Sequence, residues 1–417
     1  MKQRDKKQEI LDKAAQYVCP GKVETLQRYG IDLVIGRREG YFLYDVNGRR
    51  VIDFHLNGGV YNLGHRNPEL VVVLKEALDE LDIGNHHFPS AARAELGEAL
   101  AACTPGKLCY SVFSSGGGEA VDVAIKTARR ATGRRKIVSI HRGYHGHTGL
   151  ALAAGDERFS RAFLSEGAPD DFVQVPFNDI HAIASELCEE DVAAVLIESI
   201  PATLGFPLPA EGYLPRIKDL CSRHGALYIA DEVQTGLGRT GTLWAVQGYG
   251  VEPDILITAK GLSGGLYPIA ATVISEDVAG WLHDDGFAHI STFGGAELGC
   301  RVALKVLEIT QRPEVLGSVA TISQYIEDGL RDVQQRHRDF FAEIRRNGLV
   351  MGLRFNHEQG GMLMSKMLYD QGIWAIFAAH DPSVLQFKPG LLIDKALCDD
   401  GLKRFEDALS RCAALAE

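Results

Sequence analysis

Two charged residues stand directly after apolar runs of the sequence. Asp231 follows the run 226–230, and Lys260 follows the run 254–259. Burying either charge alone is unfavourable, so each needs an opposite charge or a bound group as a partner. A lysine in an apolar setting also forms Schiff bases readily, which suggests a site for a carbonyl cofactor with a protonated ring nitrogen. A structural ion pair between Asp231 and Lys260 is the alternative interpretation.

A glycine-rich segment, residues 114–119 (SSGGGE), lies between a strand-like run and an expected helix over 120–131. Glycines at a helix start leave backbone N–H groups free at the positive end of the helix dipole, which makes an anion site suited to a phosphate. Glu119 in the first turn agrees with that dipole. A flexible glycine turn without a ligand is the alternative.

Two other patterns are typical of sites that we do not expect here. Residues 236–241 (GLGRTG) match a dinucleotide fingerprint, but five residues separate them from the preceding strand and no clean amphipathic helix follows. His141, His145 and His147 are closely spaced, but no carboxylate or cysteine stands at ligand spacing beside them. We therefore predict neither a dinucleotide site nor a metal site.

Short apolar runs alternate with helical patterns in the middle of the chain. The expected strands are 108–114, 136–140, 192–198, 226–230 and 254–258, and the expected helices include 120–131 and 213–224. Continuous apolar runs that alternate with helices predict an α/β fold whose mostly parallel sheet is buried by helices on both faces. Such sheets bind ligands at the carboxyl ends of their strands, which is where Asp231 and Lys260 stand.

A smaller α+β domain is predicted beyond residue 300. Helical patterns cover 296–310, 314–339 and 395–415, and strand-like residues cover 341–355. The N-terminal segment, with strand-like residues 41–45 and 51–54 around the turn Asn47-Gly48, is expected to pack with this smaller domain. The predicted division is therefore an N-terminal segment 1–60, a large domain 61–300 and a small domain 301–417.

Composition narrows the class of protein. The 417 residues carry a formal net charge of −11, which argues against a nucleic-acid partner. Apolar runs such as 192–197 are far shorter than the roughly 20 residues that a membrane span needs. The opening residues 1–18 are charged and lack the apolar region of a secretory signal. The eight cysteines are scattered without a C-x-x-C pair, which indicates free thiols and a cytoplasmic enzyme.

These residues together resemble the class III, ornithine-type, pyridoxal-phosphate aminotransferases over nearly the whole chain. The matching segments are 230–241 (ADEVQTGLGRTG), 253–268 around Lys260, 144–146 (YHG), 64–65 (GH) followed by Pro68, and 291–295 (STFGG). The resemblance implies the fold type I architecture, with pyridoxal 5'-phosphate (PLP) bound in the large domain 61–300. It also implies a homodimer with active sites at the subunit interface.

The resemblance assigns chemical roles to three residues. Lys260 holds the cofactor as a Schiff base and then moves the proton as general base and acid. Asp231 keeps the pyridine nitrogen protonated, so that the ring acts as an electron sink. Gln234 bonds the phenolic oxygen of the ring.

The family resemblance also assigns cofactor-binding roles to four further residues. Tyr144 stacks on the face of the ring, and the backbone N–H groups of Gly117 and Gly118 hold the phosphate. Thr292 reaches the phosphate from the partner subunit. An ordinary packed aromatic for Tyr144 and a turn residue for Thr292 are the structural alternatives.

Two of the chain's departures from the family pattern concern the groups that bind the phosphate and the substrate carboxylate. Residues 115–118 (SGGG) stand where the family's phosphate loop usually reads Asn-Ser-Gly-Thr, so a hydroxyl donor is lost. Gln386 stands where the family commonly has the arginine that clamps the substrate α-carboxylate, and losing such a partner costs about 2–5 kcal/mol. Lys388 can compensate if the segment is extended, and another arginine such as Arg354 is the alternative.

The leading hypothesis is a PLP-dependent aminotransferase that moves an amino group from an amine or amino acid to a keto acid through the Lys260 Schiff base. The missing arginine at Gln386 motivates an alternative on the same fold, a lyase that eliminates ammonia or phosphate from an amino alcohol phosphate or phosphonate-type amine. An aminomutase and a cofactor-free scaffold are weaker options. Tyr61, His87, Gln386 and Lys388 are the candidate substrate residues.

Overall fold

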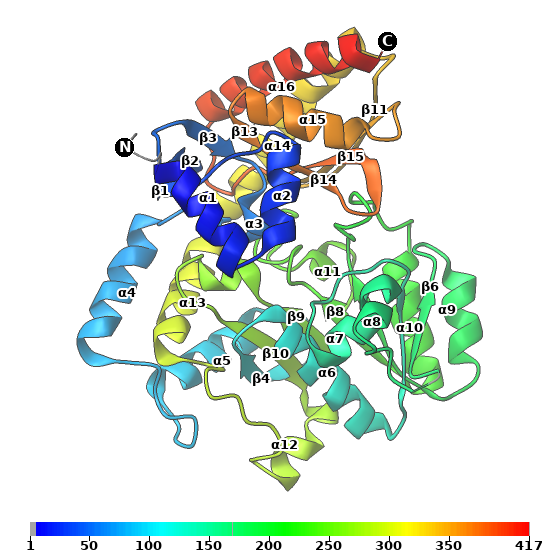
Figure 1. Cartoon of the computed structure of the whole chain (residues 1–417). Coiled ribbons are helices and arrows are strands. Elements are labelled where there is room, and N and C mark those ends of the chain that lie inside the picture. Colours follow the sequence, from blue (N-terminus) through cyan, green and yellow to red (C-terminus); the bar gives the residue numbers. More distant parts are fainter. Residues whose placement is uncertain (1–5, 169, 417) are drawn as a thin grey trace.

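The structure is a computed structural model that describes residues 6–168 and 170–416. Its centre is a seven-stranded sheet in the order β4-β10-β9-β8-β7-β5-β6 (Figure 1). The strands are β4 (Leu108–Ser114), β5 (Lys136–Ile140), β6 (Phe172–Val175), β7 (Val192–Glu198), β8 (Leu227–Asp231), β9 (Ile255–Thr258) and β10 (Ala270–Ser275). Three expected strands are confirmed residue for residue. The expected strand 226–230 is shifted by one residue from β8, and the expected strand 254–258 begins one residue before β9.

The sheet is mostly parallel, as predicted, but β10 was not expected and runs antiparallel to both its neighbours, β4 and β9. The chain passes from β9 to β10 through residues 259–269 alone. A parallel return needs a crossover of about a dozen or more residues, so this short connection sends the chain back in the opposite direction. Lys260 lies at the start of this connection.

Helices cover both faces of the central sheet. Alternate residues of β7 enter two separate apolar clusters, in which Val195 packs with α10 (Tyr213–His224) and Leu196 packs with α6 (Gly117–Thr132). Strands that are buried on both faces are apolar at every position, which explains why their sequences show no alternation.

Further helices surround this sheet. They are α4 (Pro68–Glu80), α5 (Ala91–Cys103), α7 (Gly149–Ala154), α8 (Glu157–Ala162), α9 (Ile180–Leu187), α11 (Ala245–Gly248), α12 (Gly280–Asp284) and α13 (Glu297–Thr310), with the short 3-10 helices η1 (Lys260–Ser263) and η2 (Glu276–Val278). The helix expected over 296–310 is confirmed as α13.

Two four-stranded sheets lie beside the central sheet, in the upper part of Figure 1, with orders β1-β2-β3-β13 and β11-β12-β15-β14. Their strands are β1 (Ile35–Glu39), β2 (Phe42–Asp45), β3 (Arg50–Asp53), β11 (Phe341–Asn347), β12 (Val350–Phe355), β13 (Ile373–Trp374), β14 (Ile376–Ala378) and β15 (Asp381–Phe387). The helices here are α1 (Lys6–Tyr17), α2 (Pro20–Arg28), α3 (Leu56–Gly59), α14 (Pro313–Arg336), α15 (Gly360–Asp370) and α16 (Lys395–Ala416).

The N-terminal strands are joined to the C-terminal part of the chain through a parallel pairing of β3 with β13, in which Ile52 lies beside Ile373. The helix expected over 314–339 ends earlier, at Arg336 of α14. The division of the chain at residues 60 and 300 stays a prediction.

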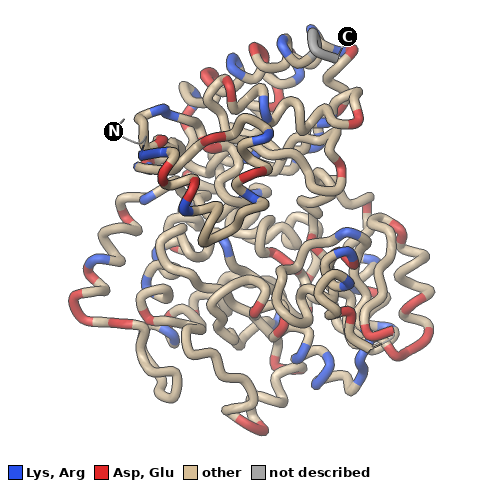
Figure 2. Tube along the Cα trace, in the orientation of Figure 1, with Lys and Arg blue, Asp and Glu red and all other residues tan. Residues whose placement is uncertain are grey.

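Charged residues lie mainly on the outer helices and loops and are sparse along the central strands (Figure 2). All eight cysteines are free thiols. Within the part of the chain that the structure describes, no helix combines the length and the apolar character needed to cross a bilayer.

Candidate active site

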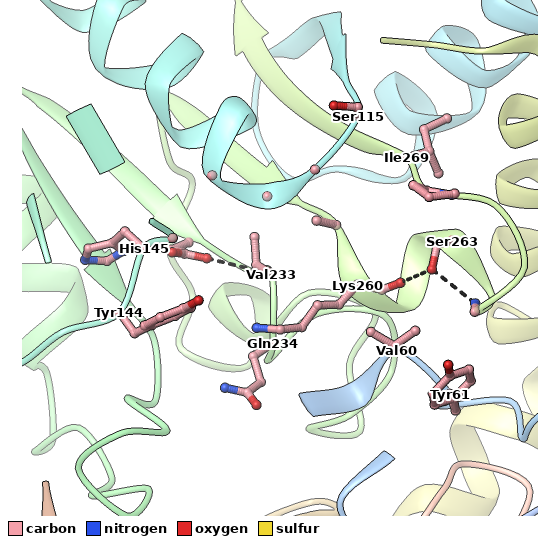
Figure 3. A pocket seen from close by; sticks show the side chains of 18 of the residues that line it. Val60, Tyr61, Ser115, Tyr144, His145, Val233, Gln234, Lys260, Ser263 and Ile269 are labelled. Atoms are coloured by element: carbon pink, nitrogen blue, oxygen red, sulfur yellow. Dashed lines mark hydrogen bonds and ion pairs between the residues drawn. The ribbon is translucent and has the colours of Figure 1, made fainter. Parts of the chain in front are cut away.

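A pocket of about 430 Å³ opens at the carboxyl ends of β7, β8 and β9. These ends are side by side, because Glu198 of β7 pairs with Asp231 of β8, and Asp231 in turn pairs with Ile257 of β9. The lining combines Asp231, Gln234, Lys260 and Tyr144 with the glycines at the start of α6 (Figure 3). Residues that are far apart in the sequence therefore meet where the parallel sheet predicts a ligand site.

Asp231 is buried and held from two sides. Its Oδ2 lies 2.7 Å from Nδ1 of His145, and its Oδ1 accepts a hydrogen bond from the backbone N–H of Val233 at 3.1 Å. Burial of His145 opposes its charged form, but the hydrogen bond to Asp231 and the charges of Asp231 and Glu198 outweigh it and raise the pKa of the imidazole. The two contacts therefore fix the position of the Asp231 carboxyl group at the pocket wall.

Glu198 is a second buried carboxyl group that lines the pocket, and the sequence analysis did not identify it as a site residue. Its Oε2 accepts a hydrogen bond from the backbone N–H of Tyr144 at 3.2 Å. Burial is the largest influence and raises the pKa of Glu198 to about 7. The signal was available in the sequence, because Glu198 ends an apolar strand as Asp231 does.

Glu232 is directed away from the pocket. Its carboxylate accepts hydrogen bonds from Ser199 and Thr235 and from the backbone N–H groups of Ala245 and Val246. Burial raises the pKa of Glu232 to about 7 even though these hydrogen bonds favour the charged form. Of these two adjacent acidic residues, only Asp231 faces the pocket, whereas Glu232 connects β8 to α11 through hydrogen bonds.

Lys260 begins η1 with a positive φ of 42°, a conformation that is uncommon for a residue with a side chain. Its carbonyl oxygen accepts a hydrogen bond from Oγ of Ser263 at 2.6 Å, which holds this turn. Burial lowers the pKa of the amine, against the opposing charges of Asp231 and Glu198. A lowered pKa favours the neutral amine, which is the nucleophilic form.

Gly58 packs directly against this lysine. A Cβ at Gly58 would lie 3.2 Å from Cε of Lys260 and 3.3 Å from Oε1 of Gln234, and the residue has a φ of +72°. Asn57 beside it also has a positive φ, of 48°. The sharp bend of the α3 segment therefore places the backbone of Gly58 against the Lys260 side chain, where a side chain at position 58 would be crowded.

The start of α6 forms another wall of the pocket. Gly116 is the N-cap residue in an extended conformation, and no side chain caps the helix. The side chain of Glu119 does not cap the helix either, because its Oε2 accepts hydrogen bonds from the backbone N–H and the hydroxyl of Ser115. The backbone N–H groups of Gly117 and Gly118 are therefore available to an anion in the pocket.

Close packing explains the glycines at this wall. A Cβ at Gly118 would lie 2.8 Å from Oγ1 of Thr148, and a Cβ at Gly146 would lie 2.7 Å from Cα of Gly118. Gly146 also has a φ of +115°. The loop after β5 can approach the start of α6 only because both positions lack a side chain.

Tyr144 projects into the pocket from the loop after β5 (Figure 3). Its ring lies 5.2 Å from the imidazole of His147, which packs in turn against Phe159. Of the histidines considered for a metal, His145 contacts Asp231 and His147 packs between Tyr144 and Phe159, so these two face different partners.

Lys388 and Gln386 lie behind Gln234. The ammonium nitrogen of Lys388 lies 2.7 Å from Oε1 of Gln386 and 3.4 Å from Oε1 of Gln234. Gln386 also donates from Nε2 to the carbonyl oxygen of Ala202 at 2.8 Å. Gln386 lies near the end of β15 and Lys388 follows directly after the strand, and their 2.7 Å contact shows that the two side chains share one side, as expected for an extended segment. Neither of them lines the pocket.

The other candidate residues lie in three different places. Tyr61 lines the pocket and packs on the imidazole of His65 with 3.8 Å between ring centroids. His87 is exposed, away from the pocket, and lies against His86 and Phe287.

Thr292 is exposed and does not line the pocket of its own chain. Arg354 pairs with Glu343 at 2.8 Å and lies outside the pocket.

The GLGRTG segment has a structural role. Arg239 is fully buried, and its guanidinium donates to the carbonyl oxygens of Pro389 and Leu349, each at 2.5 Å. A Cβ at Gly236 would lie 2.8 Å from the carbonyl oxygen of Glu232, so only glycine can occupy this turn. The segment connects β8 to the C-terminal part of the chain.

The aminotransferase class-III family matches residues 26–409 of the chain. The chain therefore belongs to the class III aminotransferases, and the family resemblance found in the sequence is confirmed. It is a PLP-dependent enzyme with the fold type I architecture.

The relatives agree with this assignment. An uncharacterized aminotransferase of Archaeoglobus fulgidus is 49% identical over 393 residues, which are 94% of this chain and 92% of the relative. A putrescine aminotransferase of Pectobacterium atrosepticum is 33% identical over 420 residues, which are 97% of this chain and 89% of the relative. The structure of the ornithine aminotransferase from Toxoplasma gondii, with partial occupancy of PLP at its active site, matches at a TM-score of 0.88 and 26% identity over 98% of this chain and 95% of that one. The lyase alternative finds no support among these relatives.

The pocket has the donor and acceptor groups that PLP needs. An uncapped helix start suits its phosphate, a buried carboxylate suits its ring nitrogen, and a lysine amine with a lowered pKa suits its aldehyde. The residues that line the pocket therefore fit the cofactor of the family.

Proposed function

We propose that Lys260 is the catalytic residue of this aminotransferase and the attachment point of the cofactor. The observation that supports this is the placement of its amine in a pocket shared with Asp231 and the start of α6. When bound, the cofactor supplies an electron-withdrawing ring that makes the proton on the substrate carbon labile. Lys260 then moves that proton, as a base in its neutral form and as an acid after it is charged.

Asp231 and Gln234 orient the ring from two sides in this proposal. The carboxylate of Asp231 holds a proton at the ring nitrogen, and the hydrogen bond with His145 holds that carboxylate in place. The amide of Gln234 donates to the phenolic oxygen of the ring. Tyr144 covers one face of the ring, while Gly117 and Gly118 bind the phosphate with their backbone N–H groups.

We further propose a homodimer in which Thr292 reaches the phosphate of the partner subunit. Thr292 is exposed and adjoins a surface of exposed apolar residues that includes Phe293, Phe287 and Phe88, at 58%, 64% and 68% exposure. Such a surface is typical of a protein interface. Light scattering tests the dimer, and Thr292→Val tests the contact, because it should weaken PLP binding in the dimer. A cytoplasmic location remains part of the proposal.

The donor substrate is a primary amine without an α-carboxylate. Gln386, in the place of the family's arginine, is already bonded to Ala202 and Lys388. Among the described residues that line the pocket there is no arginine. Of the other candidate substrate residues, Tyr61 lines the pocket and contacts the amine directly in this proposal, whereas Lys388 acts from behind Gln234 and His87 is exposed at the surface.

A matched pair of donors tests this substrate class. Butylamine and norvaline differ only by the carboxylate, and each is added to the PLP form of the enzyme without a keto acid. We expect butylamine to bleach the visible band in one half-turnover, with norvaline slower by at least about tenfold. Equal rates would contradict the proposed substrate class, and bleaching by neither donor would count against both amines as donors. Pyruvate should restore the band.

A further inference from the structure

Lys388 is a fully buried lysine that stands immediately after β15, with 1% of its surface exposed. Its backbone N–H donates to the carbonyl oxygen of Phe54 at 2.9 Å, and its Nζ lies 5.6 Å from the centre of the Phe206 ring. In the described part of the chain Nζ forms no ion pair with a carboxylate. Burial, together with the charges of Arg239 and Lys260, lowers the pKa of this amine far below its ordinary value.

The contacts of Lys388 determine which way two glutamine amides face. Nζ of Lys388 donates to Oε1 of Gln386 and to Oε1 of Gln234, and even a neutral lysine amine has the two N–H donors that these contacts need. The donation from Nε2 of Gln386 to Ala202 agrees with this direction, since it leaves Oε1 of Gln386 turned toward Lys388. Lys388 therefore stands at the centre of a hydrogen-bond network and donates to Gln234 on one side and, on the other, to Gln386, which donates in turn to Ala202.

Gln234 is the end of this chain that reaches the pocket. Its Oε1 is engaged by Lys388, and its Nε2 makes no hydrogen bond to any other described residue. The amide therefore presents N–H donors, and no acceptor, to whatever oxygen occupies that side of the pocket. A glutamine without such a partner can rotate by 180° and present its oxygen instead.

We propose that Lys388 is a positioning residue that holds the Gln234 amide with its N–H donors available to the phenolic oxygen of the bound cofactor. This inference rests on the role proposed above for Gln234. It assigns Lys388 a task different from that of a carboxylate clamp, because Lys388 lies one layer behind the pocket wall and Gln234 stands in front of it.

A double-mutant cycle on PLP binding tests the proposal. The dissociation constant is measured by titrating PLP into apoenzyme, for the wild type, Lys388→Met, Gln234→Ala and the double variant. Loss of one ordered hydrogen bond predicts that Lys388→Met weakens binding by about threefold to tenfold. Since Lys388 acts through Gln234, the double variant should bind PLP as Gln234→Ala does. Additive losses, or unchanged binding in Lys388→Met, would overturn the proposal.

Two controls separate positioning from other effects. Lys395→Met makes the same substitution at an exposed lysine seven residues away, which contacts the ring of Tyr325, and it should leave PLP binding unchanged. Lys388→Arg keeps a donor group and should recover part of the lost affinity, and Lys388→Leu replaces Lys388→Met in the cycle if that variant does not fold. A rise in the KM of carboxylate substrates with unchanged PLP affinity would identify Lys388 as a substrate residue and overturn the proposal.

The cycle also distinguishes this inference from the role proposed for Gln234. If Gln234→Ala binds PLP as tightly as the wild type, the role of Gln234 itself is wrong. If Gln234→Ala binds weakly while Lys388→Met binds normally, only the inference about Lys388 is wrong.

Discussion

The Nδ1 atom of His145 lies 2.7 Å from Oδ2 of Asp231, and both side chains are buried. The hydrogen bond to Asp231 and the charges of Asp231 and Glu198 together favour the charged form of His145 over the cost of its burial. His145 thus acts on the cofactor site through Asp231, although it came to attention in the sequence only as one of three closely spaced histidines.

Replacing His145 with leucine should weaken PLP binding by about tenfold or more, because Asp231 would lose a hydrogen-bond partner to a charged group, worth about 1.5–3 kcal/mol. The measurement is the dissociation constant of PLP from titrations of apoenzyme. His141→Leu, at an exposed histidine of the same loop, is the matched control. A His145→Leu enzyme that binds PLP as the wild type does would show that Asp231 needs no such partner.

Glu198 gives a prediction for the pH dependence of stability. Its pKa of about 7 in the folded protein lies above its ordinary value of 4.5, so the folded state binds more protons than the unfolded state between these values. The contribution of Glu198 to stability is therefore lost as pH rises from about 4.5 to 7. In apoenzyme, Glu198→Gln should gain roughly 1–3 kcal/mol over the wild type between pH 5 and pH 8.

Urea unfolding at several pH values measures this difference. Glu232 shares the raised pKa, so comparing Glu198→Gln with the wild type at each pH isolates the contribution of Glu198. A stability difference that does not change with pH would mean that Glu198 ionises normally.

Gly146→Ala should destabilise the protein by about 1–3 kcal/mol, because its φ of +115° and its contact with Gly118 both exclude a side chain. PLP affinity should fall as well, since the displaced backbone belongs to the phosphate wall. Gly97→Ala is the control, because a Cβ at Gly97 in α5 meets no atom within 4 Å. That control should gain about 0.5–1 kcal/mol in thermal unfolding. Equal behaviour of the two variants would contradict the close packing at Gly146.

Arg239→Lys should lower the free energy of unfolding by about 2–4 kcal/mol, because a lysine cannot donate to Pro389 and Leu349 in the planar geometry of a guanidinium. Denaturant titration measures the loss. If Arg239→Lys were as stable as the wild type, the buried guanidinium would not be what connects this loop to the C-terminal part of the chain.

The sequence allowed much of the fold to be predicted because β5 and β7 are continuous apolar runs with clear ends. Asp231 and Lys260 could be found by the same reasoning, since each charge ends such a run. β10 was not predicted. Its antiparallel direction follows from the short connection after Lys260, which no pattern within the strand itself reveals. The placement of Lys388 behind Gln234 depends on contacts between distant segments, which no local pattern contains.

The most direct test of the central claim is to locate the cofactor on the chain. The PLP enzyme is reduced with borohydride, which makes the cofactor–lysine linkage permanent, and the modified peptide is identified by mass spectrometry. The account predicts that the label is on Lys260 and that Lys260→Ala abolishes it. Lys388, behind Gln234, is a second buried lysine whose pKa is lowered, and it is therefore the competing site for the label. A label on Lys388, or labelling that persists in Lys260→Ala, would contradict the account.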